Sequence, residues 1–96
     1  MQTKKIKIKG KEIEVEVCNT TFSKFRGLMF RINPKPLLFI FKKPTNQRIH
    51  SFFCQSFHAY WMLNGKIIDE KIVNPFKISI KPKGKFTELL EVPLLN

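Results

Sequence analysis

The chain has 96 residues, enough for one domain with a single hydrophobic core, and we take residues 1–96 as that domain. An apolar fraction of 43% with 10 Phe excludes a disordered chain, and no apolar run approaches the roughly 20 residues that span a bilayer. The N-terminus alternates Ile with Lys and has no apolar secretory core, so we expect a soluble, cytoplasmic protein without membrane insertion.

The charge is strongly positive and unevenly distributed. There are 18 Lys and Arg against 7 Asp and Glu, a formal net charge of +11. Residues 1–48 carry 12 basic and 3 acidic side chains, whereas residues 49–96 carry 6 and 4. An excess of this size attracts polyanions such as nucleic acid, and it is equally typical of a Lys-rich surface that only keeps a protein soluble.

The first 17 residues predict a β-hairpin. Isoleucine alternates with lysine over residues 5–9, and Ile or Val alternates with Glu over residues 12–17, so each strand has one buried and one wet face. We expect a two-residue turn at Gly10-Lys11, which pairs Ile8 with Ile13 and Ile6 with Val15. The turn would also bring lysines opposite glutamates on the wet face.

After the hairpin, the spacing of the apolar residues changes from that of a strand to that of a helix. Residues 21–26 predict a short helix, with Phe22, Phe25 and Met29 on one face, and Gly27 is suited to end it. Residues 33–36 predict a proline-rich loop.

Most of the remaining chain predicts strands. Asn64-Gly65 indicates a tight hairpin turn, because these residues tolerate the positive φ that a type I′ turn requires. With the hairpin, about eight short strands and one short helix predict a mostly β fold, a compact antiparallel β-sandwich or barrel. Beyond the hairpin, the expected strands are 37–41, 48–53, 57–63, 67–73, 76–80 and 86–92.

No catalytic or metal-binding pattern stands out. Cys18 and Cys54 are too few for a disulfide framework, and we expect buried thiols. His50 and Cys54 lie four apart on an expected strand, too far for one zinc ion, and adding His58 and Cys18 gives the right ligand types but no paired ligand spacing. Cys54 with either histidine lacks the setting of an activated thiol. We therefore expect no metal or cofactor and favour a protein without catalysis, although an enzyme is not excluded.

Two further features each have two interpretations. Glu91 lies between Leu90 and Val92, where it either points inward toward a partner such as Arg26, Arg31 or His50, or points outward on an edge strand. A series of aromatic residues could form a base-stacking platform, but a small β-protein must bury most such rings, and we favour the core. The series is Phe52, Phe53, Phe57, Tyr60 and Trp61.

Several stretches in order resemble one known family. Residues 27–31 (Gly-Leu-Met-Phe-Arg) resemble its Gly-Leu-Met-x-Arg signature, and residues 38–41, 49–53, 64–68, 74–76 and 90–93 resemble its later strands and turns. The chain is thus similar, over residues 13–93, to the domain of unknown function 192 family. The resemblance implies a compact all-β domain with a small helix and no assigned activity. It makes Arg31, His50 and Glu91 the recurrent polar residues, while Ala59 stands where the family usually has aspartate.

These observations lead to three hypotheses about function. The first is a non-catalytic domain that binds a small or polymeric anionic ligand near the Gly27–Arg31 turn, where cations adjoin apolar side chains. The second is a nucleic-acid-binding protein that uses the Lys-rich N-terminal half. The third is an enzyme of unknown reaction built on Arg31, His50 and Glu91. The candidate ligand-binding residues are Arg26, Met29, Arg31, Arg48, His50 and Glu91.

Overall fold

The computed structural model describes residues 3–18, 35–49, 56–77 and 79–94, and it is mostly β. Six strands form one sheet in the order β1-β2-β3-β6-β4-β5. No helix among the described residues is long and apolar enough to cross a membrane. The strands are β1 (Thr3–Ile8), β2 (Lys11–Cys18), β3 (Leu37–Thr45), β4 (Phe57–Leu63), β5 (Lys66–Val73) and β6 (Phe86–Pro93).

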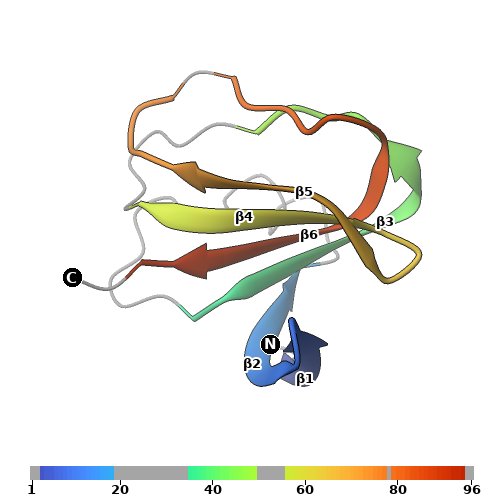
Figure 1. Ribbon diagram of the computed structural model, residues 1–96, viewed down its shortest axis with the longest axis vertical. Coiled ribbons are helices and arrows are strands. Elements are labelled where there is room, and N and C mark those ends of the chain that lie inside the picture. Colours follow the sequence, from blue (N-terminus) through green and yellow to red (C-terminus); the bar gives the residue numbers. More distant parts are fainter. Residues whose placement is uncertain (1–2, 19–34, 50–55, 78, 95–96) are drawn as a thin grey trace.

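The sheet curls into a half-barrel with β6 near its centre. Figure 1 shows β3, β6, β4 and β5 side by side, with β1 and β2 below them. Among the strand pairs, β2 with β3 is parallel and the others are antiparallel. The parallel pair departs from the expected antiparallel sheet. It is possible because the 18 residues between Cys18 and Leu37 are long enough to bring the chain back to the same end of the sheet.

The hairpin β1–β2 forms as predicted, but with another register. Ile6 pairs with Ile13, and the turn is Lys9-Gly10 rather than Gly10-Lys11. Both turn residues have positive φ, 51° for Lys9 and 80° for Gly10, which matches the twist of the strands in a type I′ turn. The shift is two residues, so the apolar side chains stay on the same face of each strand.

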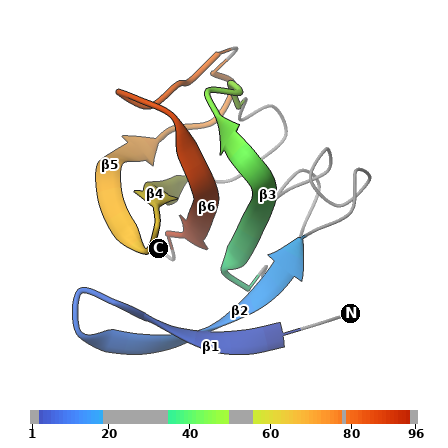
Figure 2. The same cartoon turned by 90° about the vertical axis from the view of Figure 1, so that its right-hand side faces the viewer.

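Two apolar clusters lie on opposite faces of the sheet. We call the first face the bridge face, because its cluster packs against Ile49 and Ile80, which form an isolated β-bridge. The second is the hairpin face, where β1 and β2 pack against β3, β4 and β6 (Figure 2). The buried members are Cys18, Leu37, Phe39, Phe57, Ala59, Trp61, Val73, Phe86 and Leu89 on the bridge face, and Val15, Leu38, Met62 and Leu90 on the hairpin face.

The expected eight strands and one helix are not confirmed. The expected helix over residues 21–26 lies outside the described residues, as does most of the expected strand 48–53. Residues 76–80 do not form a strand within the described part: Phe76 occupies a turn with φ of 65°, and Ile80 makes only the bridge to Ile49. The Asn64-Gly65 turn is confirmed, with φ of 52° and 81°.

Candidate functional site

Most of the predicted ligand-binding residues cannot be placed. Arg26, Met29, Arg31 and His50 lie outside the described residues, and so does the whole Gly27–Arg31 turn. The described members of the predicted site are Arg48 and Glu91, and they define two separate places in the fold.

Arg48 and Glu91 lie near opposite ends of β3. Glu91 pairs with Leu37, the first residue of β3, whereas Arg48 follows Thr45, its last residue. A strand of this length spans roughly 25 Å at about 3.3 Å per residue. The two side chains therefore do not belong to one small site.

The side chain of Glu91 points into the protein, as one of the two interpretations of the sequence predicted. It lies on the central strand β6 with only 5% of its surface exposed, opposite Leu37 on β3 and Ala59 on β4. Among the described residues, its carboxyl group forms no ion pair. Burial raises the pKa of Glu91 to about 8, so the group is mainly protonated at neutral pH.

Arg48 belongs to a strongly basic part of the surface, which we call the cationic edge. Here the end of β3 with the residues after it runs antiparallel to the segment that leads into β6, and the two are joined where Thr45 pairs with Phe86 and Ile49 with Ile80. Two backbone hydrogen bonds of 2.9 Å join Ile49 and Ile80, and Arg48 Nη1 donates to Ser79 Oγ at 3.0 Å. The exposed cations of the edge are Lys42, Lys43 and Arg48 on one segment and Lys81, Lys83 and Lys85 on the other.

Buried apolar side chains hold the two segments together. Ile49 and Ile80 pack against the bridge-face cluster, and Phe86 is a fully buried member of it, with its ring edge-on to Phe41 at 5.4 Å. The turn at residues 81–85 is also tied to β5, because Asp69 Oδ2 accepts a hydrogen bond from the Lys83 amide at 3.1 Å. The cations are therefore carried on a backbone that the core fixes in place.

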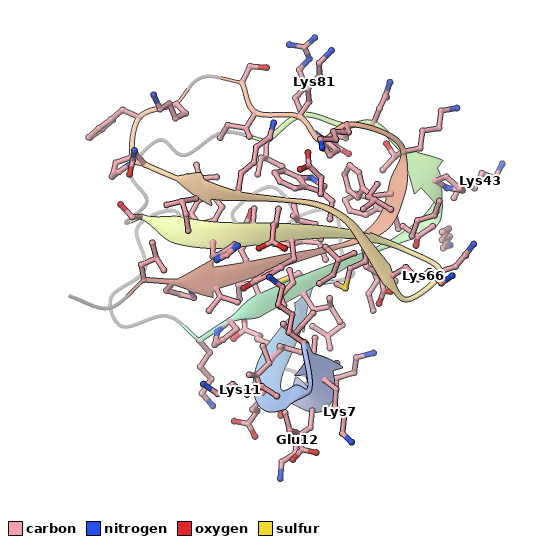
Figure 3. The ribbon with its side chains drawn as sticks, in the orientation of Figure 1. Lys7, Lys11, Glu12, Lys43, Lys66 and Lys81 are labelled. Atoms are coloured by element: carbon pink, nitrogen blue, oxygen red, sulfur yellow. The ribbon has the colours of Figure 1, made fainter. Side chains whose placement is uncertain are left out.

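The two segments of the cationic edge contain no acidic residue of their own, and the carboxylate that reaches the turn at residues 81–85 is Asp69 of β5. Neither residues 41–49 nor residues 71–87 include an acidic side chain, and none of the six cations forms an ion pair with a described residue. The hairpin differs, because its lysines alternate with glutamates and Lys5 lies 4.0 Å from Glu12. In Figure 3, Lys43 and Lys81 lie toward the right and top of the molecule, whereas Lys7, Lys11 and Glu12 lie at the lower end.

A polar cluster that the sequence did not predict lies on the hairpin face. Lys9 Nζ lies 2.9 Å from Glu70 Oε2, and Glu70 Oε1 lies 3.1 Å from His58 Nε2. The cluster links the hairpin tip to β4 and β5, and Lys9 also lies 5.8 Å from the Tyr60 ring centroid. The Lys9 ammonium lowers the pKa of the Glu70 carboxyl, and that carboxylate raises the pKa of Lys9.

The cluster does not have the geometry of a proton relay. The Tyr60 hydroxyl oxygen lies 3.3 Å from His58 Nδ1, but the two rings are stacked at 4.1 Å with planes only 10° apart. The hydroxyl thus approaches the face of the imidazole rather than the lone pair in its plane, and such contacts are weak hydrogen bonds. Among the described residues, no group of three or more His, Cys, Asp or Glu side chains could hold a metal ion.

The aromatic residues of β4 do not form a stacking platform. Phe57 and Trp61 are fully buried on the bridge face, as the core interpretation predicted, and Tyr60 is half-buried on the hairpin face. Phe52 and Phe53 lie outside the described residues.

Comparison with known proteins finds similar structures but no matching family. No family model matches the sequence, and no curated protein matches it. A protein of Sinorhizobium meliloti 1021 named a "putative transcription regulator" has a similar structure, with a TM-score of 0.79 and 17% identity over 95% of this chain and 78% of that one. A protein of unknown function from Novosphingobium aromaticivorans DSM 12444 is also similar, with a TM-score of 0.73 and 13% identity over 97% of this chain and 81% of that one. At these identities the two structures show that the chain shares their fold.

Proposed function

We propose that this chain is a non-catalytic domain that binds an anionic polymer, nucleic acid first among the candidates, through the cationic edge. One observation carries the proposal: two adjacent segments present six exposed cations, and neither segment contains an acidic residue. A polyanion that contacts such a surface releases counterions, which favours binding without any sequence readout.

The position of the cations distinguishes this proposal from the hypothesis based on the N-terminal half. Much of the positive charge in that half lies on β1 and β2, where Glu12, Glu14 and Glu16 reduce the local potential. Lys35 also lies 3.4 Å from a Glu14 oxygen. Among the described residues of the N-terminal half, the cations that belong to the cationic edge are Lys42, Lys43 and Arg48.

The named neighbour supports nucleic acid as the first ligand to test. The Sinorhizobium meliloti protein is named a "putative transcription regulator", and the two chains share a fold. Fold alone does not define function, so the support is an analogy.

We also propose that the chain is a divergent member of the domain of unknown function 192 family. The ordered motifs support this membership, and the mostly β fold agrees with what the resemblance implies. An anionic-ligand site beside Gly27–Arg31 and an enzyme using Arg31, His50 and Glu91 stay predictions, because Arg26, Met29, Arg31 and His50 lie outside the described residues.

A binding titration tests the proposed function. Fluorescently labelled single- and double-stranded DNA and RNA are titrated with the protein at about 50 mM and about 200 mM salt. If all six cations contact phosphates, affinity falls by roughly 10³-fold between these salt concentrations. No binding at the lower salt concentration, or an affinity that does not change with salt, would contradict the proposal.

A further inference from the structure

An exposed aromatic side chain lies close to the cationic edge. Phe76 has 65% of its surface exposed, whereas Phe57 and Phe86 are fully buried. It belongs to residues 74–77, which rise from the end of β5 toward the upper side of the molecule (Figure 1). A ring this exposed contributes little to the core, and most of its surface faces solvent.

The backbone conformation at Phe76 is unfavourable for a bulky residue. Its φ is 65°, in the left-handed region that glycine and asparagine adopt readily, and the residue is part of a turn. The turn does not account for phenylalanine at this position, because glycine would form it at a lower conformational cost. Strained backbone conformations cluster at active sites and ligand-binding sites. The strained backbone and the exposed ring together indicate a binding role for Phe76.

The geometry of the chain places Phe76 near the cations of the edge. Phe76 precedes Ser79 by three residues, so their Cα atoms lie at most about 11 Å apart. Ser79 Oγ accepts the hydrogen bond from Arg48 Nη1 at 3.0 Å. Residues 71–87, which include Phe76, contain no acidic side chain that would repel a polyanion. A polyanion bound at Arg48 therefore passes within reach of the Phe76 ring.

We propose that the cationic edge binds single-stranded nucleic acid in preference to duplex, with a base stacked on the Phe76 ring. This preference rests on the proposed function, because the cations of the edge must first hold the phosphate backbone. Proteins that bind single strands combine a positively charged track with aromatic rings on which bases stack. The bases of a duplex are stacked on one another, and a base must be unstacked at an energetic cost before it can contact the ring.

Two labelled probes of equal length test this preference. An oligothymidylate of about 20 nucleotides and a duplex of about 20 base pairs are titrated separately with the full chain at about 50 mM salt. We expect wild type to bind the single strand about fivefold or more tightly than the duplex. Phe76→Leu keeps an apolar side chain but removes the ring, so it should weaken single-strand binding about tenfold and duplex binding less than about twofold. The slope of log affinity against log salt concentration should not change, because no cation is removed.

Two control variants separate stacking from other effects. Phe76→Tyr keeps an aromatic ring and should retain single-strand affinity within about threefold, and Ile72→Ala, on β5 and also exposed, should change neither affinity. The fluorescence of the buried Trp61 reports whether each variant is folded. Salt-dependent binding with no preference for the single strand, or with a Phe76→Leu variant that weakens both probes equally or neither, would overturn the stacking proposal alone. No binding of either probe would contradict the proposed function, and the stacking proposal with it.

Discussion

The buried carboxyl group of Glu91 makes a specific prediction about how stability depends on pH. Its pKa is about 8 in the folded protein and 4.5 in an unperturbed chain. Below pH 4.5 both states bind the proton, so Glu91 does not affect the balance between them. Between pH 4.5 and pH 8 the unfolded state loses the proton and the folded state keeps it, and stability therefore falls as pH rises.

The size of the effect follows from the two pKa values. At about 1.4 kcal/mol per pKa unit, the difference corresponds to roughly 5 kcal/mol of folding free energy lost by pH 8. This is comparable with the whole stability of many small domains, about 5–15 kcal/mol. Glu91→Gln replaces the neutral acid by a neutral amide of the same shape, and so removes the loss.

Urea unfolding at a series of pH values measures the effect. We expect Glu91→Gln and wild type to be nearly equal in stability at pH 4.5, with the variant becoming more stable by several kcal/mol at pH 8. Glu88→Gln, on the same strand but half-exposed, is the matched control and should leave the pH dependence almost unchanged. A stability difference between Glu91→Gln and wild type that stays constant from pH 4.5 to pH 8 would refute the reasoning. So would a wild type that gains stability over the variant as pH rises, because Glu91 would then be ionised beside a cation.

Three further predictions concern the turns and the hairpin tip. Gly65→Ala should destabilise the protein by about 1 kcal/mol, because φ is 81° there, whereas Gly84→Ala should be nearly neutral in thermal unfolding, since no atom lies within 4 Å of the added methyl group. Asp69→Ala should cost about 1–2 kcal/mol in urea unfolding by removing the acceptor of the Lys83 amide, and a loss below experimental error would show that this hydrogen bond does not fix the turn. Lys9→Gln should speed amide hydrogen exchange at the hairpin tip at low salt, and the difference from wild type should vanish at about 1 M salt, where exposed ion pairs are screened.

Local patterns predicted much of the sheet. Alternating residues placed β1 and β2, and the bounds expected for the strand over residues 57–63 are those of β4. The register of the first hairpin could not be predicted in the same way. A shift of two residues keeps every side chain on its face, so the pattern alone does not distinguish a turn at Lys9-Gly10 from one at Gly10-Lys11.

The polar cluster on the hairpin face depends on an irregularity that no residue pattern marks. A strict two-residue turn at Asn64-Gly65 would pair Tyr60 with Asp69. The register of β4 and β5 shifts after Trp61, so that Tyr60 pairs with Glu70 and brings its carboxylate to His58. The cationic edge depends likewise on a long-range contact, the bridge between Ile49 and Ile80.

The measurement that tests the proposed function most directly compares two triple variants with equal charge. Lys43, Lys83 and Lys85 of the cationic edge are changed to Gln in one variant, and the hairpin residues Lys5, Lys7 and Lys11 in the other. Each variant removes three positive charges from the net charge of +11.

The slope of log affinity for labelled nucleic acid against log salt concentration is then measured for wild type and both variants. If the edge contacts the phosphates, its variant lowers the slope by roughly 2 to 3, at about 0.9 per lost contact, and the hairpin variant leaves the slope close to that of wild type. Equal changes in both variants, or no change in the edge variant, would contradict the assignment of nucleic-acid binding to the cationic edge.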